Sequence, residues 1–172
     1  MVVRSVHTDL LEGEEHYEVR NVTTGGRVRR MILTPALNAL VDGGDLPSLV
    51  MPPSSEVRIQ VPEEGGPFIL RGAAGIDLKS GRTLTEDSPP ITILFELLID
   101  GVLRFESAQR VKARAGVRGP IENPMSWVRI GGGAGLTLEG GETLLLRTDL
   151  LTSSEVPAAE LLCGFGGLRL EV

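Results

Sequence analysis

The stretch ITILFELLI-DG-VLRFESAQR, which runs from Ile91 to Arg110, decides the fold of this chain. Asp-Gly between two runs of strand formers is a strong β-hairpin signal, because a type I′ turn needs positive φ at both central residues. The first run is apolar at almost every position, which is typical of a strand covered on both faces. We therefore predict that Ile91–Ile99 and Val102–Arg110 pair antiparallel at the core. At least three of these four side chains are then expected to be nearly fully buried: Leu94, Phe95, Leu97 and Leu98.

Short apolar runs bounded by Gly and Pro continue on both sides of this hairpin. The clearest is Glu56–Val61, where Val57, Ile59 and Val61 alternate with polar residues, as in a half-buried strand. Glycines at 164, 166 and 167 inside the last run indicate a bulge or a backbone that another chain approaches closely. The other predicted strands are His16–Val22, Arg27–Thr34, Met125–Ile130, Leu136–Leu138, Thr143–Arg147 and Leu161–Leu170. Phe68–Leu70 and Ile76–Leu78 are predicted as two short strands or as one bent strand broken at Gly72.

The connections between these strands are also predicted from turn residues. Gly25-Gly26 is expected to close a second hairpin, and Gly140-Gly141 to form a tight turn between two strands. Thr34-Pro35 predicts the start of one short helix over Ala36–Val41, followed by a long loop through Pro53. The spacing predicts an all-β, jelly-roll-like sandwich or barrel of about ten short antiparallel strands.

Length and charge restrict the class of protein. A chain of 172 residues is about one domain, and we divide it into an N-terminal arm over 1–15 and a single β-sandwich domain over 16–172. The net charge of −6 argues against nucleic acid or an anionic membrane as the main partner. The first 15 residues lack the apolar core of a signal peptide, so we expect folding in the cytoplasm of the producing cell.

The residues that usually carry chemistry are sparse. The two histidines, His7 and His16, form no His-x-His pair on a strand, so we expect no metal and no other cofactor. Cys163 lies among leucines and is expected to be a small buried hydrophobe. We predict a protein that is not an enzyme and has no small-molecule substrate. Trp127, the single tryptophan, leaves carbohydrate binding open as an alternative.

The last third of the chain resembles a known family. Residues 136–146, LTLEGGETLLL, are similar to a motif of C1q/TNF-like jelly rolls, in which Gly-Asp/Glu follows an apolar strand. Residues 162–168, LCGFGGL, resemble the closing strand of that class. The resemblance implies a trimeric jelly roll, a kind that includes signalling domains, phage capsid cement proteins and fibre tips.

A second similarity concerns residues 72–78, GAAGIDL, which resemble the first motif of dUTPase-like nucleotide hydrolases. Those enzymes also need a Tyr that stacks on deoxyribose and a closing motif with hydroxyl contacts to phosphate. The only tyrosine is Tyr17, before the motif, and the closing residues LLCGFGGLRLEV contain no hydroxyl. We therefore treat 72–78 as a glycine bend that enters a strand.

Together these features favour a homotrimeric virion protein that decorates and stabilises a phage capsid, located in the virion. The alternative is a receptor- or glycan-binding jelly-roll module. The expected partners are further copies of the chain and a major capsid protein. The apolar residues of the arm need a surface to cover them, and basic residues elsewhere can receive its acidic end. The predicted partner-binding residues are Val2, Val3, Val6, Leu10, Leu11, Arg27, Arg29, Arg30, Lys112, Arg114 and Arg118.

Overall fold

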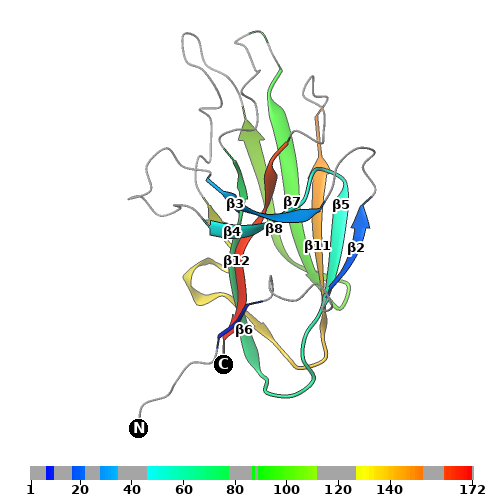
Figure 1. Cartoon of the computed structure of the whole chain (residues 1–172), viewed down its shortest axis with the longest axis vertical. Coiled ribbons are helices and arrows are strands. Elements are labelled where there is room, and N and C mark those ends of the chain that lie inside the picture. The colour runs from blue at the N-terminus through cyan, green and yellow to red at the C-terminus, as the bar shows by residue number, and fades with distance from the viewer. Residues whose placement is uncertain are drawn as a thin grey trace.

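The chain forms a β-sandwich of two antiparallel sheets that lie face to face (Figure 1). The computed structural model describes residues 7–9, 17–21, 28–34, 46–77, 87, 89–111, 127–152 and 161–171, with only the backbone at 7–9 and 17–21. The predicted all-β class is confirmed, and the two separate sheets make it a sandwich and not a barrel.

Sheet A has β12 and β6 at its centre, and its order is β10-β6-β12-β4-β3, with β1 also paired to β12 and β9 to β6. Sheet B has the order β2-β5-β11-β7-β8. The strands of sheet A are β1 (His7–Asp9), β3 (Arg29–Leu33), β4 (Leu46–Val50), β6 (Phe68–Ile76), β9 (Val128–Arg129), β10 (Leu136–Leu138) and β12 (Cys163–Glu171). Those of sheet B are β2 (Tyr17–Asn21), β5 (Ser55–Gln60), β7 (Ile91–Ile99), β8 (Val102–Val111) and β11 (Thr143–Leu150).

The predicted central hairpin is present as β7 and β8. Asp100 and Gly101 have φ of 47° and 78°, the positive values that a type I′ turn requires. The two strands pair antiparallel along their whole length, with one register shift between Leu97 and Leu98. The strand predicted over Glu56–Val61 is present as β5, and its inward residues are buried.

The prediction that three of the four named side chains of β7 are nearly fully buried is wrong. Phe95 and Leu97 are 0% exposed, but Leu94 and Leu98 are only half-buried. These leucines lie on the outer face of sheet B, where no further strand covers them within the described residues. Strand neighbours shield them only in part.

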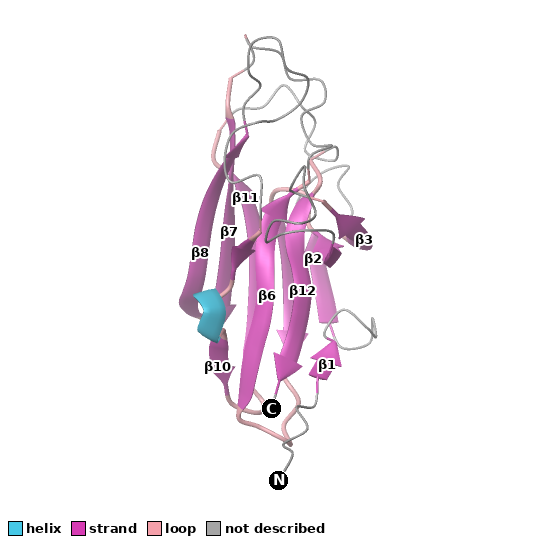
Figure 2. Ribbon diagram, turned by 90° about the vertical axis from the view of Figure 1, so that its left-hand side faces the viewer, coloured by secondary structure: helices cyan, strands magenta, loops and turns pink. Residues whose placement is uncertain are grey.

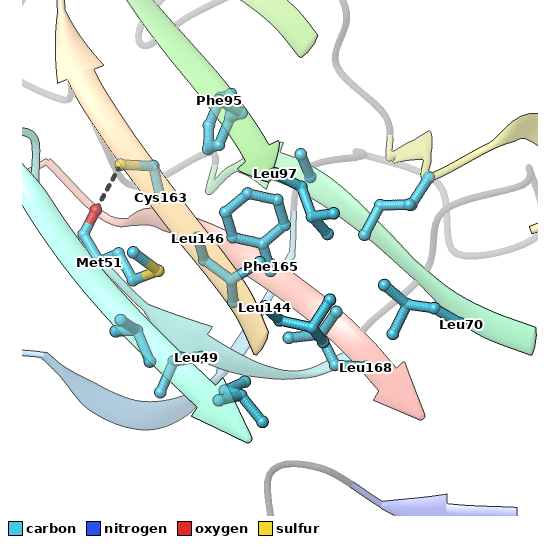
Figure 3. Close-up of a cluster of buried hydrophobic side chains, with 14 of the residues drawn as sticks. Leu49, Met51, Leu70, Phe95, Leu97, Leu144, Leu146, Cys163, Phe165 and Leu168 are labelled. Atoms are coloured by element: carbon cyan, nitrogen blue, oxygen red, sulfur yellow. Dashed lines mark hydrogen bonds between the residues drawn. The ribbon is translucent and has the colours of Figure 1, made fainter. Parts of the chain in front are cut away.

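The core lies between the two sheets. Phe95 of sheet B meets Phe165 of sheet A edge to face, with ring centroids 5.8 Å apart and planes at 87° (Figure 3). Aliphatic side chains fill the space around this pair, as the low aromatic content predicts. Cys163 is fully buried among them, and its Sγ–H donates to the carbonyl of Met51 at 3.2 Å. Burial raises the pKa of this thiol, so it behaves as the predicted small hydrophobe.

Several predicted connections differ from the structure. β2 and β3 lie in different sheets, so Gly25-Gly26 does not close a hairpin. The tight turn predicted at Gly140-Gly141 is present between β10 and β11, and it carries the chain from one sheet to the other. The predicted long loop contains β4 (Leu46–Val50), which pairs with both β3 and β12. Of the two alternatives for Phe68–Leu70 and Ile76–Leu78, the single strand is correct, since β6 runs from Phe68 to Ile76. The predicted helix over Ala36–Val41 lies outside the described residues.

Part of the predicted N-terminal arm is described. His7–Asp9 forms β1 and pairs antiparallel with the end of β12. The other residues of 1–15 lie outside the described part, so the arm stays a prediction. Within the described residues, no helix is long and apolar enough to cross a membrane.

Candidate functional site

Over Cys163–Leu168 the last strand, β12, turns its large side chains inward and carries glycine at the other positions. Phe165 and Leu168 both point into the core although three positions separate them, because the register against β6 shifts between Gly166 and Arg169. Gly167, with φ of 61°, lies in this bulge, and glycine takes that conformation without steric cost. The bulge predicted from these glycines is thereby confirmed. Gly166 is left on the outer face with no side chain, so a large neighbour can approach its backbone.

Trp127 is that neighbour. A Cβ atom added at Gly166 would come within 2.6 Å of Trp127 Cη2 and 2.9 Å of Ser48 Oγ. The indole is 9% exposed and belongs to a second apolar cluster on the outer side of sheet A. We call this cluster the Trp127 layer. It consists of Leu33, Val50, Ala73 and Trp127, with Met31, Leu46 and Leu162 partly buried against it.

A buried carboxylate fixes one end of the Trp127 layer. Asp77 follows β6 directly and is 3% exposed. Its backbone N–H donates to the carbonyl of Leu162 at 2.7 Å, and its Oδ2 accepts from the N–H of Thr34 at 2.7 Å. These hydrogen bonds tie the segment before β12 and the end of β3 to the end of β6. The bond that Oδ2 accepts from Thr34 offsets part of the hydration that this buried side chain loses.

A charged cluster lies further along the same face. Arg71 of β6 and Arg169 of β12 are directly opposite partners, and Glu171 lies between their guanidinium groups. Arg71 Nε donates to Glu171 Oε2 at 2.5 Å, and Arg169 Nε donates to Glu171 Oε1 at 3.1 Å. Each guanidinium also donates to a backbone carbonyl, Arg71 to Gly133 at 2.8 Å and Arg169 to Gly167 at 3.1 Å. The two arginines are therefore held in defined orientations.

The hydrogen bond from Arg71, followed by that from Arg169, lowers the pKa of Glu171 below its usual value. The carboxylate is therefore ionised at neutral pH and cannot donate a proton there. It remains able to accept further hydrogen bonds.

Arg129 brings a further guanidinium to this face. Its partner in the register is Ala73 of the Trp127 layer, so Arg129 and Trp127 point to the same side of sheet A. Arg129 is exposed, whereas Trp127 is mostly covered. Ligand sites combine an apolar lining with a few fixed polar groups, and this face offers both. We call the combination of Trp127, Arg129, Arg71, Arg169 and Glu171 the sheet A site.

The outer face of sheet B is different in kind. Arg147 Nε donates to Glu56 Oε1 at 3.0 Å, with both side chains about one-third exposed. That hydrogen bond raises the pKa of Arg147. Glu96 of β7 is the opposite partner of Arg147 in the register and of Glu106 in β8. The charges of this face thus form a row across the strands.

Two of the predicted partner-binding residues can be placed. Arg29 and Arg30 lie on β3, the last strand of sheet A in the described order, with Arg30 exposed and Arg29 half-buried. The other nine lie outside the described residues: Val2, Val3, Val6, Leu10, Leu11, Arg27, Lys112, Arg114 and Arg118. Arg29 is the register partner of Val50, and its Nε lies 3.2 Å from Met31 Sδ, so it borders the Trp127 layer. The predicted partner-binding role of Arg29 and Arg30 stays a prediction.

The comparisons with known proteins bear on the fold. No protein-family model matches the chain, and no curated protein is significantly similar to it in sequence. Among solved structures, the chain is similar to CBM51 from Clostridium perfringens GH95 in complex with methyl-galactose. The TM-score is 0.57 and the identity 16%, over 96% of this chain and 99% of that one. It also matches the Agl-KA catalytic domain, with a TM-score of 0.35 and 12% identity, over 96% of this chain and 29% of that one.

Proposed function

We propose that this chain is a carbohydrate-binding module that has no catalytic activity of its own. The observation that carries the proposal is the end-to-end similarity of its fold to a sandwich solved with methyl-galactose. At 16% identity the fold alone is shared, so the location of the site is argued from the side chains of this chain.

We place the sugar on the outer face of sheet A. A pyranose ring has an apolar face and a rim of hydroxyl groups, and it therefore suits an apolar surface bordered by donors and acceptors. The partly buried members of the Trp127 layer supply the apolar surface: Met31, Leu46 and Leu162. Arg129 supplies donors, and ionised Glu171 supplies an acceptor. Because Trp127 is 9% exposed, hydrogen bonds are expected to contribute more to affinity than stacking on its ring.

The electrostatics of the face support binding without hydrolysis. Glycoside hydrolysis usually needs two carboxyl groups, one of which is protonated at working pH. Glu171 is held in its ionised form by Arg71 and Arg169. A carboxylate of this kind suits recognition of hydroxyl groups and not transfer of a proton.

The test is a glycan array followed by calorimetric titration with methyl-galactose and with the best array ligand. Arg129→Ala should lower the affinity about tenfold or more, since hydrogen bonds from charged donors contribute about 1.5–3 kcal/mol. Arg58→Ala is the matched control, because Arg58 is an exposed arginine on β5 of the other sheet. No binding to any glycan, or equal losses in the two variants, would reject the proposal.

The sequence-based prediction of a homotrimeric phage capsid protein has no support from the fold or from the comparisons. Its partner and its location in the virion stay predictions, as does the absence of enzymatic activity elsewhere in the chain.

A further inference from the structure

The long strand β8 forms one margin of sheet B (Figure 2). It has 10 residues, and within the described part of the chain its only pairing is with β7. A strand at the edge of a sheet presents a row of backbone N–H and C=O groups to which another strand can add.

The register identifies which residues of β8 direct these groups outward. The N–H of Thr92 in β7 donates to Thr152 Oγ1 at 3.0 Å, and its carbonyl accepts from the N–H of Leu151 at 2.9 Å. Both groups of Thr92 therefore point away from β8, so Thr92 and its partner Arg110 form a non-hydrogen-bonded pair. By alternation along the strand, the backbone groups of Ala108 and Glu106 point toward the open edge.

We propose that β8 pairs antiparallel with β8 of a second copy of this chain, with Ala108 of both copies at the two-fold axis. A two-fold interface brings the same surface of each copy together, so the strand must be complementary to itself. In this register Glu106 lies opposite Arg110 of the second copy, and the pair occurs twice. Opposite charges at facing positions stabilise a strand pair, whereas like charges destabilise it.

The choice of axis follows from the charges. An axis at Glu106 would place two carboxylates opposite each other, and an axis at Arg110 would place two guanidinium groups opposite each other. An axis at Ala108 places two small, exposed and uncharged side chains opposite each other. Of the registers centred on Glu106, Ala108 and Arg110, only the one centred on Ala108 therefore avoids like charges at the axis.

The first test is the solution mass of the full chain by analytical ultracentrifugation over a range of concentrations. We expect a reversible dimer of twice 18.4 kDa. Ala108→Pro should give a monomer with a thermal melt close to that of the wild type, because edge strands tolerate proline where the N–H points outward. A wild-type protein that sediments as a monomer at all concentrations would overturn the proposal.

The second test reverses charges at the predicted contact. Glu106→Arg and Arg110→Glu should each raise the dimer dissociation constant about tenfold or more, and the double variant should restore dimerisation. Glu64→Arg, the same change in an exposed turn before β6, should leave the constant unchanged. A dimer that the single changes do not weaken, or that the double variant does not restore, would overturn the proposed register. Neither test depends on carbohydrate binding, so the two proposals can fail separately.

Discussion

The two sheets use their outer faces in opposite ways. Sheet A carries glycine, alanine and serine at its centre, and a second apolar layer with Trp127 covers them. Sheet B carries long leucine, arginine and glutamate side chains that shield one another and stay partly exposed. Small residues on a strand thus allow a further element to pack close to the backbone, whereas long side chains complete the surface without another layer.

The largest expected effect separates the inner and outer faces of one strand. Phe95→Ala removes a fully buried ring that meets Phe165, and should lower the free energy of unfolding by about 3–5 kcal/mol. Leu98→Ala, on the half-buried outer face, should cost about 1–1.5 kcal/mol, since much of that leucine is already in contact with water. Urea melts of the two variants provide the comparison. Similar costs would mean that both faces of β7 are equally covered.

An intermediate effect on stability is expected from substitutions on the outer faces of the two sheets, because only sheet A carries a second apolar layer. Gly166→Val places side-chain atoms where Trp127 Cη2 and Ser48 Oγ now lie, and should destabilise the fold by about 1–3 kcal/mol. On sheet B, Arg58→Ala at an exposed position should change stability by less than about 0.5 kcal/mol. Thermal melts measure both. A neutral Gly166→Val would show that the Trp127 layer is not closely packed on sheet A.

The smallest effect concerns the ion pairs of the two faces. The pKa of Glu171 is lower in the folded chain than in the unfolded one. Its ionised form therefore stabilises the fold fully at pH values above the pKa of the unfolded chain. That contribution should disappear as the pH falls through the lowered pKa. The melting temperatures of wild type and Glu171→Gln should therefore converge in acid. Glu56→Gln breaks the ion pair with Arg147 on sheet B, where both side chains are about one-third exposed. This change should lower the free energy of unfolding by only about 0–1 kcal/mol. If the difference in melting temperature between wild type and Glu171→Gln stayed constant with pH, Glu171 would not have a lowered pKa in the folded chain.

The features predicted correctly from sequence are those that local residues determine. Asp100-Gly101 specifies its own turn, and the alternation in 56–61 specifies which face of β5 is buried. The glycines of the last strand indicated a bulge, which is present at Gly167. The close approach to Gly166 comes from Trp127 of the same chain, and not from another chain as the alternative prediction had it. The strand that was missed, β4, contains Pro47, and proline is usually found outside the interior of sheets. The following residues of β4 nevertheless pair with β12, and this pairing keeps the segment in sheet A.

The candidate site was less predictable because it depends on register between distant strands. Arg71 and Glu171 are 100 positions apart in the chain, and only the pairing of β6 with β12 brings them together. The alternation in Leu168–Glu171 shows that Arg169 faces outward, but not which residues it meets. Likewise, turn residues do not indicate whether a chain returns to the same sheet, which explains the wrong hairpin at Gly25-Gly26.

The position of Trp127 has an optical consequence. As the single tryptophan of the chain, it is the dominant source of intrinsic fluorescence, and it lies outside the main core in the layer over Gly166. Its emission therefore reports on that layer, while far-ultraviolet circular dichroism reports on both sheets together. If the layer opens before the sandwich unfolds, the fluorescence transition will precede the loss of β-structure on heating. Coincident transitions will show that the layer and the sandwich form one cooperative unit.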